Sequence, residues 1–147
     1  MRTREAAKGL IRVDGGRDLL FVAGSRELWN LPGGGIKPGE TTKRALYREI
    51  QEETSASLWQ LAEIQPVFDM EGETTCADGT SYQTTWKVFS GRLTVPLSNL
   101  VIPPNSEITD MRAMSPEVFM SIPEEQMSEL ARRTVIRWAN SSIAGVL

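Results

Sequence analysis

The chain has 147 residues, of which 40% are hydrophobic and 24% are charged, a composition typical of a globular protein with a core of its own. Its 16 Lys and Arg residues and 19 Asp and Glu residues give a net charge of −3, which argues against a broad basic surface for nucleic acid. The absence of histidine and the presence of one cysteine, Cys76, exclude Ser-His and Cys-His catalysis, an intramolecular disulfide, and zinc sites built from cysteine or histidine.

The length predicts a single domain over residues 1–147. The first ten residues, MRTREAAKGL, lack the apolar core of a signal peptide, and the chain has no run of 18 apolar residues. We therefore expect a cytoplasmic protein with no membrane association.

Short apolar runs predict the first elements of the chain. Leu10–Val13 and Leu19–Val22 flank the turn sequence Asp14–Asp18, an arrangement typical of a β-hairpin. Glu27–Leu31 predicts a short strand, which ends at Pro32 and the glycines that follow it.

The next predicted element is a helix with two distinct sides. It begins after the turn Pro38-Gly39, with Thr41 or Thr42 as the N-cap. Leu46 and Ile50 lie on its apolar side, beside a side that carries carboxylates. One face of the helix can therefore pack on a sheet while the neighbouring face points into a cleft.

The middle of the chain reads as strands and connections. Segments 61–70 and 82–93 predict strands, joined by a hairpin loop over Glu71–Ser81. The prolines in and beside Leu97–Ser106 predict an irregular connection. Glu107–Met114 predicts a last strand.

The chain then reads as helical. Ser115-Pro116-Glu117 predicts a helix start, and a final helix is predicted from Pro123 to Asn140. Its apolar face consists of Met127, Leu130, Ala131, Thr134 and Trp138. This order of strands and helices predicts an α/β (α+β) sandwich.

Three carboxylates gather on one face of the first predicted helix. At a rotation of 100° per residue, Glu49, Glu52 and Glu53 fall within an arc of about 100°. No lysine shares this arc, and like charges at this spacing each cost a few tenths of a kcal/mol. If the face is not simply solvated, a cation belongs on it, and magnesium suits clustered carboxylates.

The glycine turn before the helix does not fit the common phosphate-binding loops. Gly34 and Gly39 have the spacing that opens a P-loop, but Glu40 and Thr41 follow where that loop needs Lys and Ser or Thr. The glycine spacing also fails the Rossmann fingerprint. A flexible turn remains the simplest reading of the glycines alone.

Turn and helix together resemble the Nudix box, whose pattern is G, five residues, E, seven residues, R-E-U-x-E-E-x-G-U, with U apolar. The matching positions are Gly34, Glu40, Arg48, Glu49, Ile50, Glu52, Glu53 and, as a weak apolar match, Ala56. Ser55 stands where the family has glycine, a position past the helix end that favours a left-handed backbone. Before the box, Leu31-Pro32-Gly33 also looks like the entry of this family to its box.

The resemblance implies a Nudix-like fold, with a mixed β-sheet packed between helices. It implies a Mg²⁺-dependent hydrolase (with Mn²⁺ as the alternative cation) that cleaves phosphoric anhydride bonds of nucleoside diphosphate-linked compounds. The partner it implies is a small-molecule nucleotide, and we expect no stable complex with nucleic acid. A homodimer remains one alternative for the oligomeric state.

The resemblance also assigns roles to residues. The metal ligands it implies are the carbonyl of Gly33 and the carboxylates of Glu49, Glu52 and Glu53. Glu40 and Arg48 are expected to hold the site in place without touching substrate. Catalysis falls to Glu52, Glu53 and Glu107, with Glu52 as the first choice for the base and Asp110 behind Glu107.

Aromatic residues on the predicted sheet are candidates for stacking on a nucleotide base. They are Phe21, Trp29, Phe68, Tyr82 and Trp86. The alternative for each of them is ordinary core packing.

Marks outside the box bear on the substrate. The ADP-ribose group of the family has a proline where this chain has Glu71, and the dinucleoside polyphosphate group has a tyrosine where this chain has Glu73-Thr74. The arginine-bearing signature of the coenzyme A group is not found before the box. These absences favour a nucleoside triphosphate pyrophosphatase that releases a nucleoside monophosphate and pyrophosphate. The alternatives are another diphosphate (ADP-ribose or a nucleotide sugar) and a non-catalytic nucleotide-binding or regulatory module.

Overall fold

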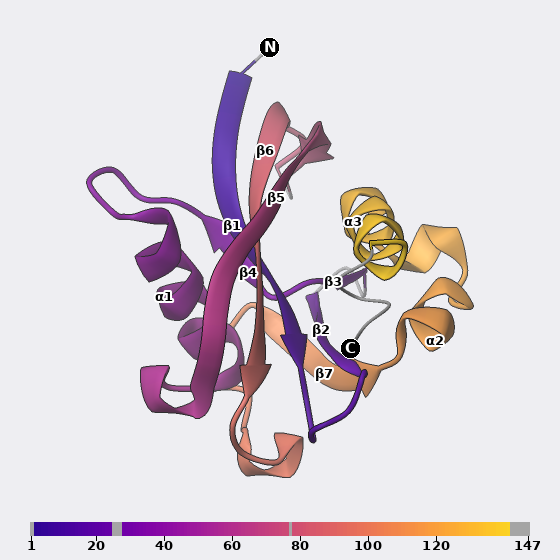
Figure 1. The fold of residues 1–147 in the computed structure, drawn as a ribbon. Helices are drawn as coiled ribbons and strands as arrows, with labels where there is room; N and C mark the ends of the chain where they lie inside the picture. Colours follow the sequence, from indigo (N-terminus) through magenta and orange to yellow (C-terminus); the bar gives the residue numbers. More distant parts are fainter. Residues whose placement is uncertain (1, 25–27, 77, 142–147) are drawn as a thin grey trace.

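A mixed β-sheet runs through the computed structural model, which describes residues 2–24, 28–76 and 78–141 (Figure 1). Its strands are β1 (Arg2–Arg12), β2 (Leu19–Gly24), β3 (Trp29–Asn30), β4 (Gly33–Gly35), β5 (Leu61–Thr75), β6 (Ser81–Leu93) and β7 (Ile108–Met114). The α-helices are α1 (Thr42–Thr54), α2 (Pro116–Met120) and α3 (Glu129–Ala139). Three short 3₁₀ helices among the described residues are η1 (Leu58–Gln60), η2 (Leu97–Asn99) and η3 (Glu124–Gln126).

The strand order is β3-β2-β1-β6-β5, with β4 added to β1 and β7 added to β2. The long central pair of β1 and β6 is parallel, from Arg2 opposite Tyr82 to Arg12 opposite Arg92. The other strand pairs are antiparallel. The sheet is therefore mixed, and β1 lies at its centre.

Side chains of β1 alternate between the two faces of the sheet. Ala7 and Ile11 belong to the core cluster that includes the apolar side of α1, whereas Ala6 and Leu10 belong to the cluster that includes α2 and α3. Figure 1 shows α1 on one side of the sheet and α2 and α3 on the other. This arrangement confirms the predicted α/β sandwich.

The predicted elements of the first half of the chain form, but β1 begins at Arg2, well before Leu10, and Gly33–Gly35, predicted as a turn, form the short strand β4. The hairpin of β1 and β2 forms, although the two strands pair only at Arg12 and Leu19 before β1 continues beside β6. Thr41 is the N-cap of α1, and its hydroxyl accepts a hydrogen bond from the Arg44 amide at 3.2 Å. The predicted strand at Glu27–Leu31 is confirmed only at Trp29–Asn30, and Glu27 lies outside the described residues.

Ser55 ends α1 in the left-handed conformation that its position in the box predicts, with φ of 65°. Its hydroxyl accepts a hydrogen bond from the amide of Val101 at 3.1 Å. The serine thus links the end of α1 to the irregular segment before β7, a contact that glycine cannot make.

The predicted loop over Glu71–Ser81 is wrong in its first part. β5 continues to Thr75 and pairs with β6 as far as Ser81, so the turn is confined to the residues between them. Gly72 suggested a turn, but in the strand it admits Leu130 of α3, whose Cδ1 lies 3.1 Å from the place of a Cβ at this position. The glycine serves packing between strand and helix.

The predicted final helix over Pro123–Asn140 is also wrong in its first part. Met127 is extended and forms a bridge with Trp29, and the amide of Ser128 donates to the Trp29 carbonyl. The Ser128 hydroxyl then caps α3 by accepting from the amide of Ala131. The five residues predicted for the apolar face are nonetheless all buried.

α3 also covers the outer side of β5, the last strand of the sheet. Arg133 donates to the carbonyl of Glu71 at 3.1 Å, and Arg137 donates to the carbonyl of Asp69 at 3.0 Å. The Arg137 guanidinium lies 4.2 Å from the centre of the Phe68 ring. These contacts fix the helix to the sheet edge.

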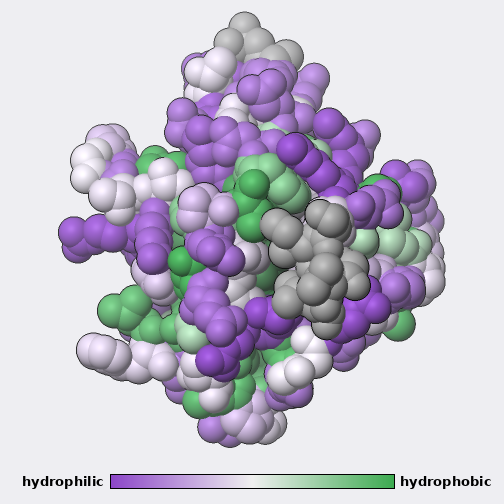
Figure 2. Space-filling view, viewed as in Figure 1, coloured by the Kyte–Doolittle hydropathy of each residue, from purple (hydrophilic) through white to green (hydrophobic). Residues whose placement is uncertain are grey.

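Hydrophilic side chains cover most of the face shown in Figure 2, with apolar side chains in smaller groups between them. Among the residues that the structure describes, the exposed large hydrophobic side chains are Leu28, Leu58, Trp59, Val101 and Val118. No helix in the described part of the chain is long and apolar enough to span a lipid bilayer.

Candidate active site

Arg48 joins the glycine turn to α1. Its guanidinium forms a two-pronged ion pair with Glu40, at 2.7 and 3.0 Å, and donates to the carbonyl of Gly35 at 2.9 Å. The same guanidinium donates to Glu49 at 2.9 Å and lies 3.4 Å from both carboxylate oxygens of Glu52. One side chain therefore holds the turn and two of the three helix carboxylates in fixed positions.

Glu40 stabilises the turn itself. Its carboxylate accepts a hydrogen bond from the amide of Lys37 at 3.0 Å. The hydrogen bonds from Arg48 and then from Lys37 lower the pKa of Glu40 to about 2. The same ion pair raises the pKa of the Arg48 guanidinium above its ordinary value, so both groups stay charged.

Glu49 packs against the backbone of the glycine turn. A Cβ atom at Gly34 would lie 2.6 Å from the carboxyl carbon of Glu49 and less than 3 Å from its two oxygens. Gly34 is required because its missing side chain leaves the space that this carboxylate fills.

Glu53 is partly buried and contacts the turn at the neighbouring glycine. Its carboxylate accepts a hydrogen bond from the amide of Gly33 at 2.8 Å. Burial raises the pKa of Glu53 to about 7, repulsion from Glu49 and Glu52 adds to the rise, and the ammonium of Lys8 opposes it. The three carboxylates thus share one face of α1. Glu53 is the one whose negative charge is disfavoured by burial.

A cleft opens along this face. Two adjoining cavities, of about 520 and 700 Å³, both contain Glu53 and Glu107 in their walls. The smaller cavity also contains Arg48, Glu49 and Glu52, whereas the larger runs towards β1 and the N-terminal end of β3. The box carboxylates therefore lie at one end of a continuous groove.

The outside candidates for catalysis separate in the structure. Glu107, just before β7, lies in the cleft wall with Glu52 and Glu53. Asp110 lines neither cavity; its carboxylate accepts from the amide of Met111 and pairs with Arg112 at 3.3 Å. The structure brings Glu107 to the helix carboxylates and leaves Asp110 in a local ion pair.

The aromatic candidates do not line the cleft. Phe21 is fully buried and stacks on Phe119 with ring centres 4.1 Å apart, so it offers no face to a ligand. Trp29 and Trp86 are also buried, under the cations of Arg112 and Lys8 respectively. These three rings are packed in the core and are absent from the walls of the cleft, so their role in substrate binding stays a prediction without support from the structure.

Tyr82 and Phe68 are more accessible but lie outside the cavities as well. Tyr82 lies beneath the Arg4 guanidinium, at 5.6 Å, and Phe68 beneath Arg137. Neither ring is part of the wall of either cavity. The cleft is lined instead by polar and aliphatic side chains.

The sequence pattern did not single out several cleft residues. They include Arg4, Lys8, Asn30, Ser106 and Thr109. The position of Lys8 could have been found from the sequence. It lies two residues from both Ala6 and Leu10, so it shares their inward face of a buried strand. Burial lowers the pKa of this ammonium, against the opposing charges of Glu53 and Glu49.

The chemistry of the donor set fits a hard divalent cation. Among the residues that the structure describes, no three acidic or cysteine side chains converge as a metal-binding group, and Arg48 pairs with both Glu49 and Glu52. All the candidate ligands are nevertheless oxygens, of the kind that Mg²⁺ and Mn²⁺ prefer. Burial, and after it repulsion from Glu49 and Glu52, raises the pKa of Glu53, and a divalent cation at this face would favour the charged form of the carboxylate.

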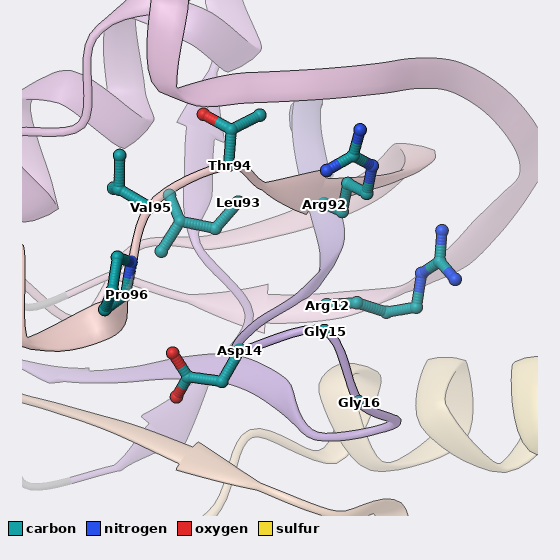
Figure 3. Close-up of a pocket in the computed structure, with 9 residues that line it drawn as sticks. All are labelled: Arg12, Asp14, Gly15, Gly16, Arg92, Leu93, Thr94, Val95 and Pro96. Carbon is teal, nitrogen blue, oxygen red and sulfur yellow. The ribbon is translucent and has the colours of Figure 1, made fainter.

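A separate hollow of about 510 Å³ lies at the other end of β1 (Figure 3). Its walls include Arg12 and Arg92, and both arginines pair with one oxygen of Glu63, at 3.2 and 3.3 Å. Figure 3 shows the Asp14 carboxylate turned away from these arginines. The hollow shares no lining residue with the cleft, and both of its arginines are already paired with Glu63.

Known proteins resemble this chain in sequence and in fold. Nucleoside triphosphatase NudI of Escherichia coli O1:K1 / APEC is 43% identical over 70 residues, which cover 45% of this chain and 49% of that protein. RNA pyrophosphohydrolase of Teredinibacter turnerae is 45% identical over 47 residues, which cover 31% of this chain and 28% of that protein. The chain thus spans half or less of the length of these relatives.

The fold has close counterparts among solved structures. The E. coli dihydroneopterin triphosphate pyrophosphohydrolase superposes with a TM-score of 0.72 at 16% identity, over 94% of this chain and 97% of that chain. At this identity the likeness shows the fold alone. The model of the NUDIX domain, in contrast, matches residues 2–139, nearly the whole sequence. The chain therefore belongs to the Nudix family.

Proposed function

We propose that this chain is a Mg²⁺-dependent hydrolase of phosphoric anhydride bonds, and that its substrate is a nucleoside triphosphate cleaved to a nucleoside monophosphate and pyrophosphate. The observation that carries the proposal is the placement of Glu49, Glu52, Glu53 and Glu107 in the wall of one cavity of the cleft. Family membership supports the reaction class, and the partial similarity to nucleoside triphosphatase NudI supports the substrate class.

The side chains of the site divide the work. Magnesium, when bound by Glu49, Glu52 and Glu53, supplies neutralisation of the phosphate charge and polarisation of a phosphoryl oxygen. Arg48 orients Glu49 and Glu52, and its own charge is balanced by Glu40, so it positions the ligands without needing to contact substrate.

Glu52 is our first choice for the general base, and Glu107 is the second. Glu52 is the most exposed of the three helix carboxylates and faces the same cavity as Glu107, so either can accept a proton from a water molecule in the cleft. The amide hydrogen bond from Gly33 to Glu53 leaves Glu53 less free for this role. Comparing kcat for Glu52→Gln and Glu107→Gln over a range of pH distinguishes the two.

The cleft supports a small-molecule substrate. Its larger cavity, about 700 Å³, is of the size that takes a nucleotide, and Arg4 and Lys8 supply positive charge along it. We further propose that residues 1–147 act as one domain without stable nucleic acid binding. We also propose a cytoplasmic location.

A substrate panel with purified protein and Mg²⁺ tests the proposal. It contains common and oxidised nucleoside triphosphates, ADP-ribose, nucleotide sugars, dinucleoside polyphosphates and dihydroneopterin triphosphate, and it measures release of phosphate or pyrophosphate. Glu53→Gln serves as the inactive variant, and Glu117→Gln is a matched control, because Glu117 is exposed on α2 and lines neither cavity of the cleft. Triphosphate cleavage that persists unchanged in Glu53→Gln would contradict the assignment of the site.

The second candidate is a Nudix-fold module that binds a nucleotide without cleaving it. The ion pairs of Arg48 with Glu49 and Glu52 favour it, since two of the three carboxylates already have a cationic partner. A rise in melting temperature with a nucleotide, without any product at saturating Mg²⁺ or Mn²⁺, would support this module and refute the hydrolase.

A further inference from the structure

Lys8 is the one charged residue among the buried side chains of the described part of the chain, with 7% of its surface exposed. It lies on the central strand β1, opposite Gly33 of β4 on one side and Val88 of β6 on the other. A buried ammonium is unfavourable unless its hydrogens are bonded and its charge is balanced, so its surroundings show what it is bound to.

The ammonium is held at the glycine turn. It donates to the carbonyls of Leu31, at 3.1 Å, and Gly33, at 3.3 Å, and lies 4.8 Å from the centre of the Trp86 ring. These contacts satisfy two of its three hydrogens and place a positive charge over the face of an aromatic ring.

Lys8 and Glu53 bind the two backbone polar groups of Gly33. The amide of Gly33 donates to Glu53 at 2.8 Å, while the Gly33 carbonyl accepts from Lys8. Both side chains also line the larger cavity of the cleft, and the charges that act on Lys8 are those of Glu53, Glu49 and Arg4. The Gly33 carbonyl, which the family resemblance assigns to the metal, thus already has a cation.

We propose that Lys8 is a built-in cation of the carboxylate site, which competes with a divalent cation for the Gly33 carbonyl and lowers the affinity of the site for such cations. The inference rests on the metal site of the proposed function and concerns how that site is balanced. A fixed charge beside carboxylates repels a divalent cation that approaches the same carboxylates, and burial strengthens this repulsion. Lys8 acts here as a positioning residue, since its bonds fix the turn that Glu49 and Glu53 pack against.

The test measures Mn²⁺ affinity by electron paramagnetic resonance or calorimetry, without substrate. Lys8→Gln removes the charge but keeps a donor for the carbonyls, and we expect it to bind Mn²⁺ on the order of tenfold more tightly. Lys43→Gln is the matched control: this exposed lysine of α1 undergoes the same change of charge and should leave the affinity within about twofold, because solvent screens it. Equal or weaker Mn²⁺ binding by Lys8→Gln would overturn the inference.

A second measurement uses the unaltered protein, so the inference stays testable if Lys8→Gln does not fold. The hydrogen-bonded Lys8 ammonium is followed by ¹⁵N nuclear magnetic resonance during a Mg²⁺ titration. Retention of its slowly exchanging signal at saturation supports the inference, and loss of the signal would show that the metal takes the Gly33 carbonyl. Failure of the unaltered protein to bind any Mn²⁺ would refute the proposed metal site itself, whereas identical affinities in all the variants would refute only the role of Lys8.

Discussion

Gly34→Ala should remove most of the proposed hydrolase activity while leaving the protein folded. No left-handed φ is required at Gly34, so its backbone accepts alanine. The added Cβ would lie 2.6 Å from the carboxyl carbon of Glu49, about 0.8 Å short of the 3.4 Å at which ordinary contact begins. Since only the end of a flexible side chain blocks the methyl group, Glu49 moves and the fold remains.

The expected loss of activity follows from this displacement. Moving a catalytic or metal-binding group by about 1 Å costs on the order of 100-fold in rate, or about 2.7 kcal/mol of transition-state stabilisation. The free energy of unfolding should change by less than about 1 kcal/mol, because replacing glycine also reduces the entropy of the unfolded chain. We therefore expect kcat/KM to fall about 100-fold with a nearly unchanged melting temperature.

Two neighbouring substitutions make the comparison sharp. Gly33→Ala requires a backbone φ of 133° from alanine and puts its Cβ 2.9 Å from the Cα of Lys8, so it should destabilise the fold. Gly16→Ala has no atom within 4 Å and should change neither activity nor stability. The assay is kcat/KM at saturating Mg²⁺ together with thermal unfolding. Full activity in Gly34→Ala would refute the reasoning, and so would a loss of stability as large as that of Gly33→Ala.

Three further predictions concern stability. Because Arg48 lowers the pKa of Glu40 from its ordinary 4.5 to about 2, the ion pair stabilises the fold fully above pH 4.5, and this stabilisation is lost as the pH falls towards 2. Chemical denaturation should show that the difference in unfolding free energy between wild type and Glu40→Gln shrinks over this pH range. Ser55→Ala and Ser55→Gly both lose the hydrogen bond to Val101, but the left-handed backbone at this position is strained for alanine and not for glycine. The unfolding free energy of the alanine variant should therefore be about 1 kcal/mol lower than that of the glycine variant, and equal values in urea denaturation would contradict this. Phe119→Ala should cost about 3–5 kcal/mol because it empties a fully buried stack, and a loss below 1 kcal/mol would show that the core closes over the gap.

The sequence predicts the parts of this fold that depend on neighbours along the chain. The turn at Pro38-Gly39, the cap at Thr41 and the common face of Glu49 and Glu53 are local consequences of helix geometry. They define the carboxylate end of the site, and the long spacing of the box made the family recognisable.

The parts that were missed depend on contacts between distant segments. The extension of β5 to Thr75 is set by pairing with β6, and the break before α3 is set by Ser128 and Met127 meeting Trp29. Phe21 is an aromatic residue of the kind that can stack on a nucleotide base, but in the fold its ring is covered by Phe119, which is distant in the sequence. Lys8 likewise resembles an ordinary strand lysine until the turn that it binds is brought beside it.

Two arginines of α3 affect the edge of the sheet at which strands of another molecule could pair. β5 is the outer strand of its side of the sheet, and outer strands offer free carbonyls to which a foreign strand can add. Arg133 and Arg137 occupy two of these acceptors, on Glu71 and Asp69, and bring positive charge to the same edge. α3 therefore hinders the addition of a strand from another molecule at this edge, and it also completes the core.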